Sequence, residues 1–179
     1  MQRLAYTKFV TADTTFLPLE DALAINAGAK VIRGDVEWRQ MPDKNSNVFH
    51  ASFVVFNQKS ETIPGLTVEL QFVRPEVPGQ CKYLYTVYTL VGATTKRRSF
   101  QVEVVPPDRI KHRENGVAVS GPHQHVAEKF FPVDDDARNL GCAHCLEWFN
   151  YFCRKTNISH EGGFFEPDPP HPQTNFQFL

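Results

Sequence analysis

Two histidines one residue apart are the side chains of this sequence best suited to chemistry. His123 and His125 directly follow the turn signal formed by Gly121 and Pro122. Successive side chains of a β-strand alternate faces, so both imidazoles would project from one face, about 6.6 Å apart along the strand. Imidazole exchanges protons near neutral pH and is also the commonest metal ligand. The spacing therefore predicts either an acid and a base flanking a phosphate, or half of a metal site.

An acid and a base flanking a phosphate would suit metal-independent cleavage of RNA, the activity implied by the family resemblance described below. That reaction needs a base to remove the 2′-hydroxyl proton, an acid to protonate the departing 5′-oxygen, and a cation to stabilise the crowded phosphate. We assign His125 as base or acid, His123 as its partner, and His112 as a reserve acid. For any one of these histidines, the alternative is a core or loop residue satisfied by backbone hydrogen bonds.

Positive charge is concentrated just before the histidine pair. The segment from Lys96 to Arg113 is basic, although the whole chain carries a formal charge of only −1. Arg97, Arg98 or Lys111 would stabilise a phosphate there. The alternative is that these are ordinary solvated charges at strand ends and in loops.

The cysteines suggest a metal site of a different kind. Cys81, Cys142, Cys145 and Cys153 are too few and too clustered for the disulfide framework of a secreted scaffold, so we expect reduced thiols or ligands. A closed tetrahedral zinc site would have the four ligands His123, His125, Cys142 and Cys145. Without it, no cofactor is expected.

The segment from Leu140 to Asn157 is predicted to be an amphipathic helix. Its apolar residues recur at intervals of three and four and share one face: Cys142, Cys145, Leu146, Phe149, Phe152 and Cys153. A free cysteine on such a stripe behaves as a small hydrophobe. Core packing is therefore the first interpretation of the Cys-x-x-Cys motif, with zinc binding and redox chemistry as alternatives.

Strands must position the histidines. They are expected at Val31–Trp38, Val48–Phe56, Leu66–Phe72, Tyr83–Val91, Phe100–Val105 and His123–Val126. Short connections between consecutive strands favour an antiparallel sheet. The interval 108–121 is polar and is expected to be irregular. Tyr83 and Tyr85 share a face that Tyr88 does not, which favours core or rim packing over the stacking of bases.

A short helix is expected ahead of the strands, beginning at Pro18 and ending near Gly28, where a left-handed cap costs little. The 179 residues are predicted to form a single α+β domain over 1–158, followed by a proline-rich extended tail over 159–179. No apolar run is long enough to span a membrane, so we predict a cytoplasmic protein without membrane contact.

Short motifs over about residues 80–158 resemble small bacterial and phage-borne proteins related to TumE-type toxins. The motifs are Pro-Pro-Asp at 106–108, His-Arg-Glu-Asn-Gly at 112–116, Pro-His-Gln-His at 122–125, and a helix ending in Phe-Asn-Tyr-Phe-Cys-Arg-Lys-Thr-Asn-Ile at 149–158. The resemblance implies an α+β fold and action on RNA. A toxin-like endoribonuclease acting through the histidine pair is therefore the first functional hypothesis.

The competing hypothesis is an interaction or inhibitor protein of phage or mobile-element origin that performs no chemistry. Such a protein would bind a partner protein through an exposed patch, and the three aspartates at 134–136 could supply one. It could also contain the zinc site. The apolar end of the tail, Phe176–Leu179, could dock on the domain itself or on a second copy in a homodimer.

Overall fold

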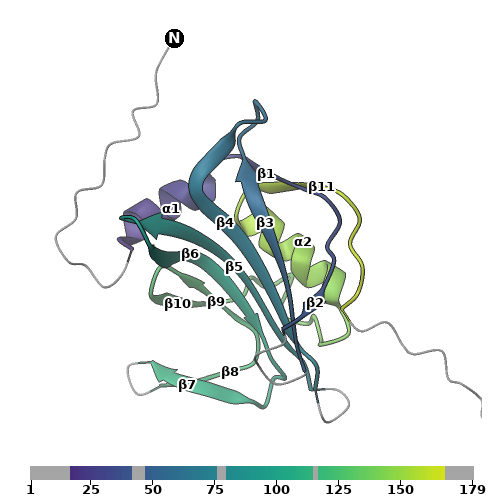
Figure 1. Cartoon of the computed structure of the whole chain (residues 1–179). Coiled ribbons are helices and arrows are strands. Elements are labelled where there is room, and N and C mark those ends of the chain that lie inside the picture. Colours follow the sequence, from purple (N-terminus) through teal and green to yellow (C-terminus); the bar gives the residue numbers. More distant parts are fainter. Residues whose placement is uncertain (1–16, 42–46, 76–79, 115–116, 168–179) are drawn as a thin grey trace, which may run out of the picture.

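The computed structural model describes residues 17–41, 47–75, 80–114 and 117–167. These ranges contain two helices, α1 (Leu19–Ala27) and α2 (Cys145–Lys155) (Figure 1). The strands in chain order are β1 (Lys30–Arg33), β2 (Arg39–Gln40), β3 (Val48–Phe56), β4 (Thr62–Val73), β5 (Lys82–Val91), β6 (Thr95–Val104), β7 (Ile110–Glu114), β8 (Val117–Ser120), β9 (His123–Val126), β10 (Lys129–Pro132) and β11 (Ile158–Glu161).

Nine of these strands form one mixed sheet. Its order is β10-β9-β6-β5-β4-β3-β1-β11, and β2 pairs with β3 beside this path. The pair of β1 and β11 is parallel, whereas the other neighbours are antiparallel. Strands β7 and β8 form a separate two-stranded sheet. The structure thus confirms the α+β class and the largely antiparallel sheet.

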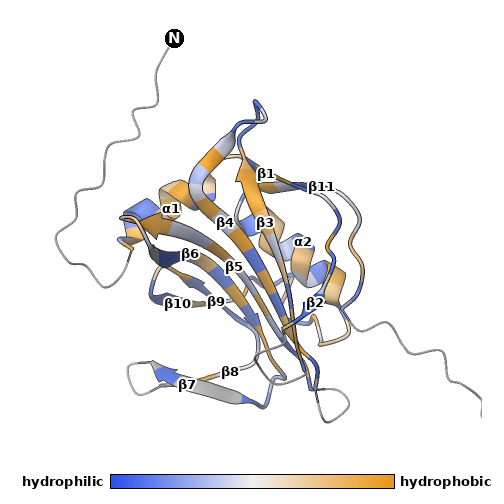
Figure 2. Cartoon of the chain, in the orientation of Figure 1, coloured by the Kyte–Doolittle hydropathy of each residue, from blue (hydrophilic) through white to orange (hydrophobic). Residues whose placement is uncertain are grey.

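The long central strands have one apolar face and one more polar face. Along β4 the buried residues alternate with less buried ones, and Figure 2 shows the matching alternation of orange and blue. Leu66, Val68, Leu70 and Phe72 are buried, as their spacing predicts. This alternation decides which side of the sheet forms the core.

Helix α2 packs against the apolar face. The Tyr85 ring lies 5.9 Å from that of Phe152 and 6.2 Å from that of Phe149. Tyr83 and Tyr85 are both buried, which confirms that they pack in the core. The helix is shorter than its periodicity predicted, because it begins at Cys145. Leu146 is 43% exposed rather than part of the buried stripe.

The residue that follows the carboxyl end of α1 does not have the expected left-handed conformation. Gly28 follows the helix as predicted, but its φ is −64°, an extended rather than left-handed conformation. Lys30 instead satisfies the helix end, because its buried ammonium donates to the carbonyls of Ile25, Asn26 and Gly28. A cation at the carboxyl end of a helix is also favoured by the helix dipole.

Two segments are more ordered than the sequence indicated. The interval 108–121, expected to be irregular, contains the β7–β8 hairpin. The expected start of the tail, residue 159, falls within β11, which pairs with β1. Residues 168–179, including the apolar end of the tail, lie outside the described residues. In the described part of the chain, neither helix is long and apolar enough to cross a membrane.

The cysteines also differ from the expectation of reduced thiols. Cys81, just before β5, forms a disulfide with Cys142, just before α2. The two residues are 61 positions apart in the chain, but folding brings their Cα atoms to 5.4 Å. Cys145 and Cys153 are free and buried.

Candidate metal centre

Strand β9 presents both histidines on one face, as their spacing predicts. It lies between β6 and β10, and its register places His123 opposite Glu103 and His125 opposite Gln101. Residues paired in this way project from the same face of the sheet. On the neighbouring strand β5, Tyr85 is opposite Val102, so the histidine face is the one turned away from α2.

A carboxylate completes the group. The Nε2 atom of His123 lies 3.5 Å from the Oε2 atom of Glu103. One ligand atom from each of Glu103, His123 and His125 can be chosen so that all three lie within 4.8 Å of one another. The two imidazole rings are 5.1 Å apart between centroids and nearly perpendicular. We call these three residues the Glu103 centre.

The centre is well shielded from water. His123 is 1% exposed and His125 is 7% exposed, while the side chain of Glu103 retains 13%. Phe130 on β10 is paired with His125 and forms an apolar wall, 5.5 Å from the ring of His123 and 6.2 Å from that of His125. Low exposure strengthens the electrostatic attraction between these ligands and any cation among them.

The turn before β9 fixes the orientation of the first imidazole. The Nδ1 atom of His123 lies 2.9 Å from the carbonyl oxygen of Gly121. A carbonyl can only accept, so Nδ1 carries the proton, and in the neutral ring the lone pair is on Nε2, facing Glu103. Metal-ligating histidines usually donate their second ring nitrogen to a carbonyl or a carboxylate in this way.

Gly121 is required for this turn. Its φ is +71°, a left-handed conformation that other residues adopt only with strain. A Cβ atom added there would lie 3.3 Å from the Cα atom of Pro107. The glycine–proline signal thus places the backbone carbonyl that sets the tautomer of His123.

Two imidazole nitrogens and one carboxylate oxygen suit a divalent first-row transition metal ion. Bond lengths of about 2.0–2.2 Å put tetrahedral ligand atoms about 3.4 Å apart. The 3.5 Å separation between His123 and Glu103 already meets this requirement. Three protein ligands would leave at least one coordination position for water or another small ligand.

The zinc set that includes cysteines is not assembled. The sulfur of Cys142 is bonded to Cys81. The Sγ atom of Cys145 lies 3.2 Å from the hydroxyl of Tyr85, on the side of the sheet that α2 covers. Burial raises the pKa of Cys145 to about 11, so the thiol is not a ready source of thiolate. The histidines therefore have neither cysteine as a co-ligand.

The predicted phosphate-binding residues are only partly brought to the centre. Arg98 donates to the side-chain oxygen of Gln101, opposite His125, and also to Ala127 and Glu128. Arg97 directly precedes Arg98 on β6 and points to the other face of the sheet. The side chains of Lys111 and His112, on β7, lie outside the described residues.

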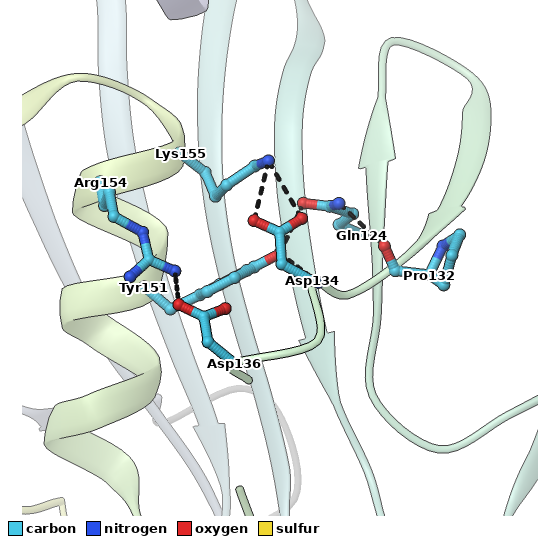
Figure 3. A network of polar contacts seen from close by, with 7 residues as sticks. All are labelled: Gln124, Pro132, Asp134, Asp136, Tyr151, Arg154 and Lys155. Atoms are coloured by element: carbon cyan, nitrogen blue, oxygen red, sulfur yellow. Dashed lines mark hydrogen bonds and ion pairs between the residues drawn. The ribbon is translucent and has the colours of Figure 1, made fainter. Parts of the chain in front are cut away.

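The aspartates expected to form an exposed acidic patch are paired with basic side chains. Asp134 contacts Lys155, and Asp136 contacts Arg154 at 2.7 Å (Figure 3). Asp135 contacts Arg138. Asp134 and Asp136 thus tie the segment after β10 to α2, and each of the three aspartates has a basic partner within the molecule.

A surface cleft of about 330 Å³ lies elsewhere, against β2 and β3. It is lined by polar residues that include Asp35, Glu37, Arg39 and His50. In the sheet order, β3 is separated from β9 by β4, β5 and β6. None of the residues singled out from the sequence lines this cleft.

Glu103 is the member of the centre that sequence reasoning missed. The alternation of Phe100–Val105 made it a polar strand residue, but nothing in the sequence indicated that β9 would pair with β6. No protein-family model, curated protein or solved structure matches this chain. The resemblance to TumE-type toxins stays a prediction.

Proposed function

We propose that this protein binds a divalent transition metal ion through Glu103, His123 and His125. The observation that carries the proposal is the convergence of three ligand atoms of suitable chemistry, all within 4.8 Å, at a shielded position. The bond from His123 to the Gly121 carbonyl supports it, because it turns the Nε2 lone pair toward the carboxylate.

Zinc is the ion to test first. Mixed nitrogen and oxygen ligands accept Zn²⁺ without imposing a geometry that the ion resists, since its filled d shell has no directional preference. Magnesium and calcium are disfavoured because they prefer oxygen ligands. The ion would stabilise the contact between β6 and β9, because its ligands come from both strands.

The test is a titration of chelator-treated protein with Zn²⁺, followed by calorimetry, and with Co²⁺, followed by its visible absorption. We expect about one ion per chain. The Glu103→Gln variant keeps the shape of the side chain but removes its charge. We expect it to weaken zinc binding by more than about 100-fold, more than the loss of a second-shell partner usually costs.

The matched control is Glu69→Gln. Glu69 lies on the same polar face of the sheet, on β4, and pairs with Lys96 and His50 rather than with the Glu103 centre. The zinc affinity of the Glu69→Gln variant should equal that of the wild type. Absence of binding to the wild-type protein, or equal binding to both variants, would refute the proposal.

Metal-independent cleavage of RNA by the histidine pair is the second candidate. It is supported by the contact between His123 and Glu103, a carboxylate that can hold an imidazole in position, and by Arg98 near His125 through Gln101. Burial of both imidazoles favours the metal instead, because a phosphodiester must touch both rings at once. Cleavage of labelled RNA that survives a chelator and disappears in His125→Ala would favour the nuclease.

A further inference from the structure

The residue between the two histidines points to the opposite face of β9, where α2 lies. Gln124 is paired with Val102 of the apolar face and is only 5% exposed. A buried amide needs hydrogen bonds at both ends. Here both ends have them, since Nε2 donates to the Pro132 carbonyl at 2.9 Å and Oε1 accepts from the Tyr151 hydroxyl at 3.0 Å (Figure 3).

Tyr151 connects this amide to the end of β10. Its hydroxyl accepts the backbone N–H of Asp134 at 3.1 Å while donating to Gln124. The carboxylate of Asp134 in turn binds the ammonium of Lys155, with both oxygens at 3.2 Å. Burial raises the pKa of Tyr151 to about 12, so the hydroxyl keeps its proton at neutral pH. We call Gln124, Tyr151, Asp134 and Lys155 the Gln124 clamp.

The clamp and the Glu103 centre act on the same four-residue strand from opposite faces. His123 and His125 are the immediate neighbours of Gln124, so a displacement of its backbone moves both imidazoles. Metal ligands must be held within a few tenths of an ångström of their bonding positions. The partners of Gln124 therefore determine whether the nitrogen atoms can reach one ion together with Glu103.

We propose that the Gln124 clamp couples the docking of α2 to ion binding at the Glu103 centre. This inference rests on the proposed metal site and adds how that site is regulated. Docked α2 holds β9 in the register and tilt that bring the three ligands together. Thermodynamic linkage requires the reverse effect of equal size, so a bound ion holds α2 more firmly. Tyr151 is thus a positioning residue.

The experiment compares Tyr151→Phe with Tyr85→Phe. Both remove one buried phenol oxygen between the sheet and α2, but Tyr85 contacts Cys145 and makes no bond to β9. We expect Tyr151→Phe to weaken zinc binding by about 10-fold or more and to change the visible spectrum of bound Co²⁺. Tyr85→Phe should change affinity by less than about two-fold. Equal effects of the two variants, or none, would overturn the coupling.

A metal-free measurement separates this inference from the proposed function. The ring ¹⁵N signals of His123 and His125, and the hydrogen exchange of β9 amides, report the clamp directly. We expect both to change in Tyr151→Phe and to stay as in the wild type in Tyr85→Phe. Wild-type protein that binds no ion would refute the metal site and the coupling. In that case the ring ¹⁵N signals of the histidines in Tyr151→Phe would still show whether Tyr151 positions them. Signals unchanged from the wild type would overturn that role as well.

Discussion

The sequence indicated two closely spaced pairs of residues that could bind a metal, His123 with His125 and Cys142 with Cys145. The fold keeps the first pair together as a candidate site, but it does not do so for the second pair. His123 and His125 stay together on one face of β9 and gain Glu103 as a neighbour. Cys142 and Cys145 are separated in role, because one is in a disulfide before α2 and the other is buried at the start of α2. The histidines form a candidate site, whereas the cysteines hold the fold together.

The difference lies in the elements that carry each pair. A spacing of two on a strand puts both side chains on one face whatever the rest of the fold does. A spacing of three shares a face when both residues lie on one helix, but α2 begins at the second cysteine. In this chain the His-x-His spacing therefore predicted a shared face correctly, whereas the Cys-x-x-Cys spacing did not.

The largest expected effect is on metal affinity when one of the paired histidines is removed. His125→Ala should reduce zinc binding by more than about 100-fold, because two ligands cannot hold the ion in competition with water. Cys145→Ala should leave the affinity unchanged. Calorimetry on the two variants measures the comparison directly, and a loss of affinity in Cys145→Ala would show that the cysteines belong to the site after all.

The next effect is on stability, when the disulfide is removed. The double variant Cys81→Ser and Cys142→Ser should lower the free energy of unfolding by about 2–4 kcal/mol, because the bond closes a loop of 61 residues in the unfolded chain. Denaturation in urea measures this change. Zinc affinity at a temperature where both proteins are folded should stay the same. A fall in that affinity would contradict the separation of the two pairs.

A smaller effect is expected from the turn before β9. Gly121→Ala should cost about 1–2 kcal/mol of stability, because φ is +71° and the new Cβ meets Pro107. It should also weaken zinc binding by about 10-fold, since the carbonyl that orients His123 must move. Gly92→Ala is the control, with a φ of +70° and no atom near the added Cβ. Equal affinities of the two variants would show that the carbonyl does not orient a metal ligand.

The last expected effect is a dependence on pH that has opposite signs for the stability contributed by Cys145 and for zinc binding at the Glu103 centre. Burial raises the pKa of Cys145 from about 9 to about 11, so the folded state binds more protons than the unfolded state in this window. The free energy of unfolding should therefore fall as pH rises from about 9 to about 11, and Cys145→Ala should show a smaller fall. Zinc affinity should instead increase as pH rises from acid values, because the ligands must lose their protons. Urea denaturation across pH and zinc titrations at several pH values test both signs.

The elements with strong local patterns were predicted well. The bounds of β3 coincide with the predicted Val48–Phe56, and β4 and β5 contain the predicted strands. The amphipathic pattern located α2 but not its start, because Cys142 continues the spacing without continuing the helix. The hairpin β7–β8 and the parallel strand β11 were missed, since polar residues and glycines mask short strands that are stabilised by their neighbours.

By itself the sequence determined the alternation of the long strands, the amphipathic face of α2, the common face of His123 and His125, and the turn that precedes them. These properties depend on the periods of strands and helices and on residues close together in the chain. Only the tertiary structure decided that Glu103 faces His123, that Cys81 meets Cys142, and that Tyr151 reaches Gln124. The physical reason is that pairing of β6 with β9 and docking of α2 bring together residues far apart in the chain. Local conformational preferences do not specify which distant residues will become neighbours.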